Sequence, residues 1–296
     1  MNSMILKEIH RSLLFSKLAS KYPYELNIEI KQSKFKDIHK IIFNNDINFI
    51  ENDTFKSYVF KYNNIIYICI HSTLKYHDDK ELIKLKDNIY INNNVLSQYK
   101  AFEDKIIKNI SELNDTKLIK KLYICGYNSG GALATLTSAI LAEKYRNMFL
   151  VSCFTFGCPK IGNKYFKKYF NKYITCNYRI IISNDLNIQT EWPHYEHISD
   201  GLLLENDNIM EIIEKENNVY DNIIKYISKK KINYIENSIT IDEYIYRFNN
   251  LISIYQSNVL NKEISIRKLI SNNDDNLFID KTNDINNIVL PSTFYT

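Results

Sequence analysis

Three glycines flank Asn128 and Ser129, two residues that differ in their capacity for nucleophilic attack. The segment Gly126-Tyr127-Asn128-Ser129-Gly130 joins an apolar run to an alanine-rich run, and Gly131 follows directly. Ser129 carries a hydroxyl, which becomes a good nucleophile when a base takes its proton. The amide nitrogen of Asn128 is delocalised into its carbonyl and has no lone pair for attack. The chemistry of this turn therefore depends on which of the two residues a substrate meets.

Hydrolysis of an ester by a hydroxyl also requires an imidazole and a carboxylate that orients it. Asp185 follows an apolar run, and His194 comes nine residues later. The chain has six histidines, and none of them follows His197. An isolated aspartate after a strand more often caps a turn, so Asp185 alone does not define a catalytic acid.

The elements around these residues alternate between strand-like and helix-like patterns. A strand at 118–125, a tight turn and a helix at 130–145 surround Asn128. Alternation of this kind predicts an α/β fold with a mainly parallel sheet flanked by helices. The other predicted elements are helices at 4–20, 95–112 and 160–172, strands at 56–61, 64–71, 149–156 and 177–183, and a turn at Asn63-Asn64.

The C-terminal third is predicted to add helices rather than a second catalytic domain. Residues 195–204 are consistent with a short strand, and helices are expected at 207–228 and 240–256. The polar last residues favour a loosely ordered tail. We therefore predict one domain over 1–265 and a tail over 266–296.

Composition excludes several classes of function. The 296 residues include 45% hydrophobic residues and carry a net charge of only +4, with no basic stripe interleaved with aromatics. Nucleic acid is therefore not an expected partner. The chain lacks G-x-G-x-x-G, G-K-[ST] and C-x-x-C, so no nucleotide cofactor or metal is expected. Abundant isoleucine and asparagine, against 6 Gly and 4 Pro, indicate an AT-rich genome.

The N-terminal residues do not have the pattern of a secretory signal. Lys7, Glu8, His10 and Arg11 interrupt the apolar positions, whereas a signal peptide has a continuous apolar core. No apolar run reaches the roughly 18 residues of a membrane-spanning helix. We expect a cytoplasmic protein whose five cysteines are reduced and lie in the core.

Four segments, in order, resemble the fungal-type (class 3) triacylglycerol lipases. The segment 126–136, GYNSGGALATL, is similar to the family's G-H-S-L-G-G-A-L-A-x-L. The segment 154–166, FTFGCPKIGNKYF, is similar to Y-T-F-G-x-P-R-V-G-N. Segments 65–73 and 183–199 are similar to the family's strand before the oxyanion turn and to its aspartate-containing segment. This resemblance implies an α/β-hydrolase fold, whose strand–turn–helix is the nucleophile elbow.

The resemblance assigns roles to individual residues. Asn128 occupies the nucleophile position in place of serine, and Asp185 matches the acid. Thr73 matches an oxyanion residue, and Ser129 matches the residue whose backbone N–H completes the oxyanion hole. The family's base lies shortly before a helix that carries a tyrosine, here Tyr244, but residues 237–241 contain no imidazole.

These substitutions predict a lipase-like pseudoenzyme that binds a lipid acyl chain or a protein partner. An alternative is an active lipase or esterase that uses Ser129 with His194 as the base. A further alternative is deamidation of Asn128 to an aspartate nucleophile. The resemblance also places a lid at 74–93, where Leu82, Ile83 and Leu85 could form a short apolar helix face; its charge favours an exposed loop or helix instead.

Overall fold

The computed structural model describes most of the chain. The described residues are 3–25, 47–74, 81–115, 117–182, 185, 188, 194–199, 201–204, 209–212 and 239–271.

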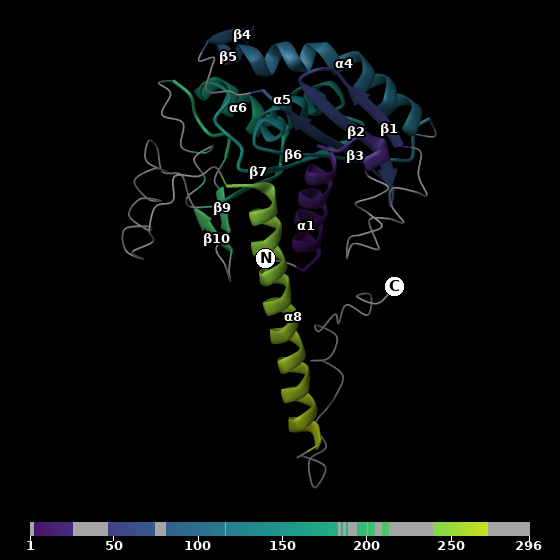
Figure 1. The fold of residues 1–296 in the computed structure, drawn as a ribbon, viewed down its shortest axis with the longest axis vertical. Coiled ribbons are helices and arrows are strands. Elements are labelled where there is room, and N and C mark those ends of the chain that lie inside the picture. Colours follow the sequence, from purple (N-terminus) through teal and green to yellow (C-terminus); the bar gives the residue numbers. More distant parts are fainter. Residues whose placement is uncertain are drawn as a thin grey trace. The chain divides into compact units, whose positions relative to one another are not determined.

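A twisted sheet forms the centre of the protein (Figure 1). Within the described residues it has eight strands in the order β1-β2-β3-β6-β7-β8-β9-β10. The strands are β1 (Ile47–Glu51), β2 (Phe55–Tyr62), β3 (Ile65–Ser72), β6 (Lys121–Tyr127), β7 (Leu150–Phe156), β8 (Cys176–Ile181), β9 (Gly201–Leu204) and β10 (Ile209–Ile212).

The middle of this sheet is parallel and its two sides are antiparallel. Strands β3, β6, β7, β8 and β9 run parallel to their neighbours in that series. The pairs β1–β2, β2–β3 and β9–β10 are antiparallel. The predicted mainly parallel α/β sheet, with 120–125 as a central strand parallel to both neighbours, is confirmed.

Helices cover both faces of the sheet. On one face, α1 (Ser3–Leu18) contacts β3, β6 and β7. On the other, α5 (Ser129–Lys144) contacts the same three strands and also α4 (Asn93–Leu113) and α6 (Lys164–Tyr173). Because β3 is covered on both faces, Ile65 to Ile70 are all buried, as its nearly continuous apolar run predicts.

The β2–β3 hairpin turns at the predicted dipeptide. Asn63 and Asn64 have φ angles of 48° and 57°. Two consecutive positive φ angles define the turn that matches strand twist in a two-residue hairpin, and asparagine tolerates them. The turn therefore fixes the register of β2 against β3, with Tyr62 opposite Ile65.

The predicted lid segment forms a hairpin rather than a helix or a loop. Strands β4 (Leu82–Lys86) and β5 (Ile89–Asn92) pair antiparallel around a turn in which Asp87 has a φ of 41°. Leu82 and Leu85 pack on the core, whereas Ile83 is 37% exposed. The interspersed lysines concealed the alternation of apolar residues that is typical of a strand. Residues 75–80 of this segment lie outside the described residues.

Two C-terminal predictions also require correction. The helix predicted at 207–228 is wrong at its start, because Ile209–Ile212 form β10 against β9. Short apolar runs do not distinguish helix from strand by periodicity, and pairing with an available edge decides. Residues 213–228 lie outside the described residues. The helix predicted at 240–256 exists as α8 (Ile241–Ser271) and is longer than expected.

Contacts divide the chain into two units, residues 1–251 and 252–296. In the second unit, α8 continues to Ser271, and residues 272–296 lie outside the described residues. The boundary predicted at residue 265 stays a prediction. Over the described ranges, no helix has the length and apolarity needed to span a membrane.

Candidate active site

Asn128 occupies a sharp turn between β6 and α5. Its φ and ψ are 49° and −117°, a region that non-glycine residues rarely adopt and that costs about 1–3 kcal/mol. Its N–H donates to the carbonyl of Phe156 at the end of β7, 2.9 Å away. Its carbonyl accepts from the N–H of Ala132 at 3.0 Å, in the first turn of α5. This strained strand-to-helix turn is the geometry of a nucleophile elbow.

Two glycines make the turn sterically possible. A Cβ at Gly126 would lie 2.2 Å from the carbonyl oxygen of Gly130. A Cβ at Gly130 would lie 2.3 Å from the carbonyl oxygen of Ile70 in β3. Both distances are far below van der Waals contact, and the neighbouring atoms are backbone. The backbone at the start of α5 therefore packs directly on the backbones of β3 and β6, with no room for a side chain at Gly126 or Gly130.

Asp185 lies beyond β8 at the carboxyl edge of the sheet. It is fully buried, and its N–H donates to the carbonyl of Ile182 at 3.1 Å. Its carboxylate lies on the backbone of Gly157, since a Cβ there would be 2.4 Å from Oδ2. Gly157 directly follows β7, whose last carbonyl accepts from Asn128. The carboxylate and the elbow thus meet where three parallel strands end.

The phenol of Tyr244 contacts this carboxylate. Tyr244 lies in the first turn of α8 and is fully buried, and its hydroxyl donates to Oδ2 of Asp185 at 2.8 Å. Burial, with the negative charge of Asp185, raises the pKa of the Tyr244 phenol well above its usual value. The phenol therefore stays protonated near neutral pH and serves as a donor. The sequence prediction that Tyr244 marks a helix is confirmed.

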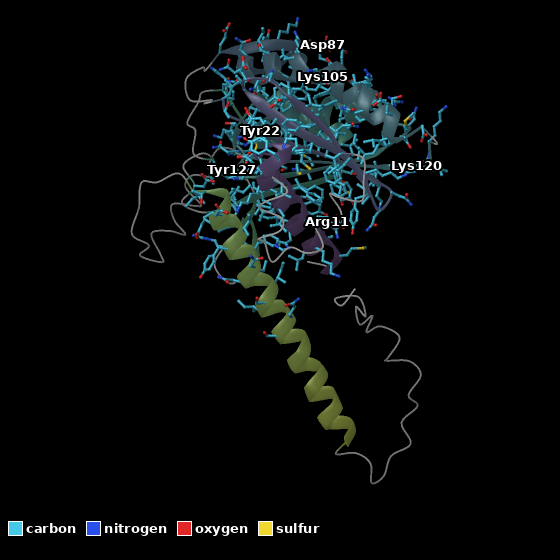
Figure 2. All side chains as sticks on the ribbon, turned by 45° about the vertical axis from the view of Figure 1, so that its right-hand side comes forward. Arg11, Tyr22, Asp87, Lys105, Lys120 and Tyr127 are labelled. Carbon is cyan, nitrogen blue, oxygen red and sulfur yellow. The ribbon has the colours of Figure 1, made fainter. Side chains whose placement is uncertain are left out.

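A second tyrosine connects the start of α8 to the elbow. The hydroxyl of Tyr127, labelled in Figure 2, donates to the carbonyl of Ile239. The rings of Tyr127 and Tyr244 meet edge to face with centroids 5.9 Å apart. Residues 239–241, part of the segment where the resemblance expects a base, therefore lie beside the elbow. They are Ile, Thr and Ile, and residues 237–238 lie outside the described residues.

Ser129 directs its hydroxyl to the backbone. It is the first residue of α5 and is only 7% exposed, and its Oγ donates to the carbonyl of Leu74 at 2.5 Å. A carbonyl accepts this hydrogen bond but takes up no proton, so it does not activate the hydroxyl. In this arrangement Ser129 connects α5 to the segment that follows β3.

The described histidines lie in different environments. His197, which matches the family's structural histidine, is buried with Nε2 3.2 Å from the carbonyl of Ile188. Burial, assisted by the guanidinium of Arg179, lowers the pKa of His197 well below its usual value. His194 lies exposed at a turn with a φ of 72°. The role of His194 as a base stays a prediction.

Thr73 is exposed and already hydrogen-bonded to a strand end. Its N–H and its hydroxyl approach the carbonyl of Thr54 at 2.9 and 3.2 Å. An N–H in an oxyanion hole must instead point at the reacting oxygen. The oxyanion role of Thr73 stays a prediction, and in this conformation the donors point toward β2.

Sequence reasoning missed a polar network next to Thr73. The hydroxyl of Ser72 donates to Oε1 of Gln98 at 2.9 Å, and Nε2 of Gln98 donates to the carbonyl of Thr54 at 3.1 Å. Gln98 is 5% exposed on an otherwise apolar face of α4. A buried glutamine among apolar helix positions was the available signal, since buried polar groups require partners.

No metal site supplements this arrangement in the described part of the chain. No group of three or more histidine, cysteine, aspartate or glutamate side chains is placed there to hold an ion. The five cysteines are free thiols, four of them buried. Burial raises the pKa of Cys158 to about 11, so this thiol is protonated near neutral pH.

The parallel sheet, the elbow and the carboxylate beyond β8 define the chain as an α/β-hydrolase fold. The crystal structure of lipase II from Rhizopus niveus has the same fold, with a TM-score of 0.64 and 15% identity. That similarity covers 76% of this chain and 92% of the lipase. Residues 54–188 match the family described as lipase (class 3).

Curated relatives match over shorter segments. Toxin TseL of Vibrio cholerae serotype O1 is 34% identical over 85 residues, and phospholipase A1-II 1 of Oryza sativa subsp. indica is 30% identical over 99 residues. These segments are 28% and 30% of this chain. They span only 13% and 25% of those two proteins.

Proposed function

We propose that this protein binds lipid acyl chains at the carboxyl edge of its sheet without hydrolysing them. One observation carries the proposal: the side chain held at the strained tip of the elbow belongs to Asn128. A hydrolase needs an activatable nucleophile there, and an amide provides none. The geometry of the elbow supports a site that still binds a ligand at this edge of the sheet. Asn128 at its tip supports the absence of ester hydrolysis.

The partner of Asp185 supports the same proposal. A general base near neutral pH requires a pKa near the working pH. The phenol of Tyr244 has a pKa raised well above its usual value, so it is neutral and donates its proton to the carboxylate at 2.8 Å. An Asp185–Tyr244 pair orients the start of α8 and does not relay a proton to a substrate.

The kind of ligand follows from the family of the matched segment. Class 3 lipases are named for lipid substrates, and the matched rice protein is named a phospholipase. A site that retains the frame of such an enzyme is best suited to a long-chain acyl group. A protein partner at the same edge is the competing outcome.

Paired assays on the full chain test the proposal. We expect no hydrolysis of short-chain or long-chain p-nitrophenyl esters above a heat-inactivated control. We also expect saturable binding of a fluorescent long-chain fatty acid, displaced by unlabelled fatty acid. Hydrolysis that disappears in Ser129→Ala would establish the Ser129 enzyme instead. Absence of both hydrolysis and acyl binding would reject lipid as the ligand.

A further inference from the structure

Helix α6 presents a regular row of lysines on its outer face. Its sequence, KYFKKYFNKY, directs Phe166, Tyr169 and Phe170 into the core. Lys164, Lys168 and Lys172 are exposed and recur every four residues. At about 1.5 Å of rise per residue, successive lysines are roughly 6 Å apart along the helix.

These lysines lie close to two tyrosine rings, of which Tyr165 is exposed and Tyr173 is half-buried. The Nζ atoms of Lys164 and Lys168 lie 5.3 and 5.8 Å from the ring centre of Tyr165, which is 40% exposed. Nζ of Lys172 lies 5.1 Å from the ring centre of Tyr173. Within the described ranges, the ion pairs found near α6 involve other lysines. The row thus combines positive charge with aromatic surface.

Nearby acidic groups are engaged by those other lysines. Glu143 of α5 pairs with Lys86 at 2.6 Å and accepts from the hydroxyls of Tyr169 and Tyr173 at 2.7 and 3.1 Å. Glu196 lies 3.9 Å from Lys167. These contacts partly neutralise the two carboxylates and leave the outer row of lysines facing solvent.

The β4–β5 hairpin extends this surface and is fixed to α6. Asn163, which caps α6, donates from its N–H to the carbonyl of Tyr90 at 3.0 Å. Its Nδ2 donates to the carbonyl of Asn88 at 2.9 Å. Tyr90 and Ile83 are each 37% exposed. The hairpin therefore adds an exposed aromatic ring and an aliphatic side chain, together with one acidic residue, Asp87, at its turn.

We propose that the surface formed by Lys164, Tyr165, Lys168, Lys172 and Tyr90 docks onto a bilayer that contains anionic lipids. Lysines near such a surface are attracted to its negative potential, by about fivefold in affinity for each residue. Exposed tyrosines favour the headgroup level, where the ring is in apolar surroundings and the hydroxyl stays hydrated. This proposal goes beyond acyl binding, because it uses no residue of the elbow or of the Asp185 site.

Flotation of the full chain with lipid vesicles tests the docking surface. The wild type should bind vesicles that contain phosphatidylserine and not vesicles of phosphatidylcholine alone, and high salt should release it. The triple variant Lys164→Gln/Lys168→Gln/Lys172→Gln should lower the partition coefficient about 100-fold. Tyr165→Ser should lower it less.

A matched triple variant distinguishes the effect of this surface from the effect of a lower net charge. Lys108, Lys117 and Lys120 are exposed, and their change to glutamine removes the same charge elsewhere. Figure 2 shows Asp87 of the hairpin turn at the top of the view and Lys120 lower down, at its right side. This control should retain most of the vesicle binding. An equal loss in both triples, or equal binding to neutral vesicles, would overturn the proposal.

Two further measurements keep the outcomes distinct. The α6 triple should still bind the fluorescent fatty acid, so loss of vesicle binding with retained acyl binding concerns the docking surface alone. Single-stranded RNA should not compete with vesicles. If RNA binds the wild type more tightly than the vesicles do, and the α6 triple abolishes that binding, the lysine row is a nucleic-acid surface and the bilayer proposal is wrong.

Discussion

The elbow and the first turn of α8 lie at the same edge of the sheet but are held there by different kinds of contact. At the elbow, backbone segments approach so closely that Cβ atoms at Gly126 and Gly130 would overlap carbonyl oxygens. Side chains fix the start of α8, through the hydroxyls of Tyr127 and Tyr244. The backbone geometry of a hydrolase elbow can thus be maintained by close packing, even when the side chains needed for hydrolysis have been replaced.

The largest expected loss of stability comes from a substitution within the elbow itself. Gly126→Ala places a Cβ 2.2 Å from a backbone oxygen and should lower the free energy of unfolding by about 4 kcal/mol or more. Gly131→Ala is the control, because its Cβ would meet its nearest atoms at 3.1 and 3.2 Å and should cost about 1–3 kcal/mol. Urea unfolding measures both. Equal costs would show that the Gly126 contact is not what fixes the turn.

The second prediction adds a nucleophile at the elbow and a base at the start of α8, and tests whether the two together produce ester hydrolysis. Asn128→Ser alone should not produce turnover, because an unassisted serine is almost fully protonated near neutral pH. Ile241 lies three residues before Tyr244 on α8, so its side chain shares the same helix face. Asn128→Ser/Ile241→His should exceed the single variant by about 10²–10⁴-fold in ester hydrolysis.

The control for this experiment is Ser129→Ala in the double variant. It should preserve the gain, because its backbone N–H is unchanged. If Asn128→Ser alone reaches the rate of the double variant, another group in the chain supplies the base.

Acid should loosen the contact between α1 and the start of α8. His10 of α1 stacks on Phe248 of α8 with ring centres 5.7 Å apart, and burial lowers the pKa of His10 to about 4. The folded state thus binds this proton less readily than the unfolded state, so stability is complete above pH 6.5 and decreases toward pH 4. The loss is at most about 3 kcal/mol.

Hydrogen exchange at several pH values measures this effect. Amides of residues 241–248 should lose protection over that interval. His10→Phe retains a ring against Phe248 and has no group to titrate, so it should flatten the dependence. A pH profile unchanged in His10→Phe would assign the effect to other groups.

The smallest effect concerns the Asp185 contact alone. Tyr244→Phe removes the hydroxyl that donates to a buried carboxylate and should cost about 1.5–3 kcal/mol of stability. Tyr246→Phe is a matched control on the same helix, because Tyr246 is 60% exposed; it should change stability by less than about 0.5 kcal/mol. Thermal unfolding distinguishes the two variants.

The sequence predicted those parts of the protein in which local pattern and topology agree. The glycines of 126–131 between an apolar strand and a helix identified the elbow, and the Asn63-Asn64 turn identified a hairpin. Strand β4 was missed because its lysines interrupt the apolar alternation, and β10 was missed because so short an apolar run does not distinguish a strand from a helix. The contacts of Ser129 with Leu74 and of Tyr127 with Ile239 join residues 55 and 112 positions apart, and composition does not encode such pairs.

The long span of these contacts has a consequence for how the chain is made on the ribosome. Synthesis proceeds from the N-terminus, and early segments can begin to fold first. The α8 partners of Lys17 and Asp185 emerge late: Asp242 contacts Lys17 across 225 positions, and Tyr244 contacts Asp185 across 59. The nascent sheet therefore holds the carboxylate of Asp185 without its tyrosine until translation has passed residue 244. Completion of the first unit is thereby postponed to a late stage of synthesis.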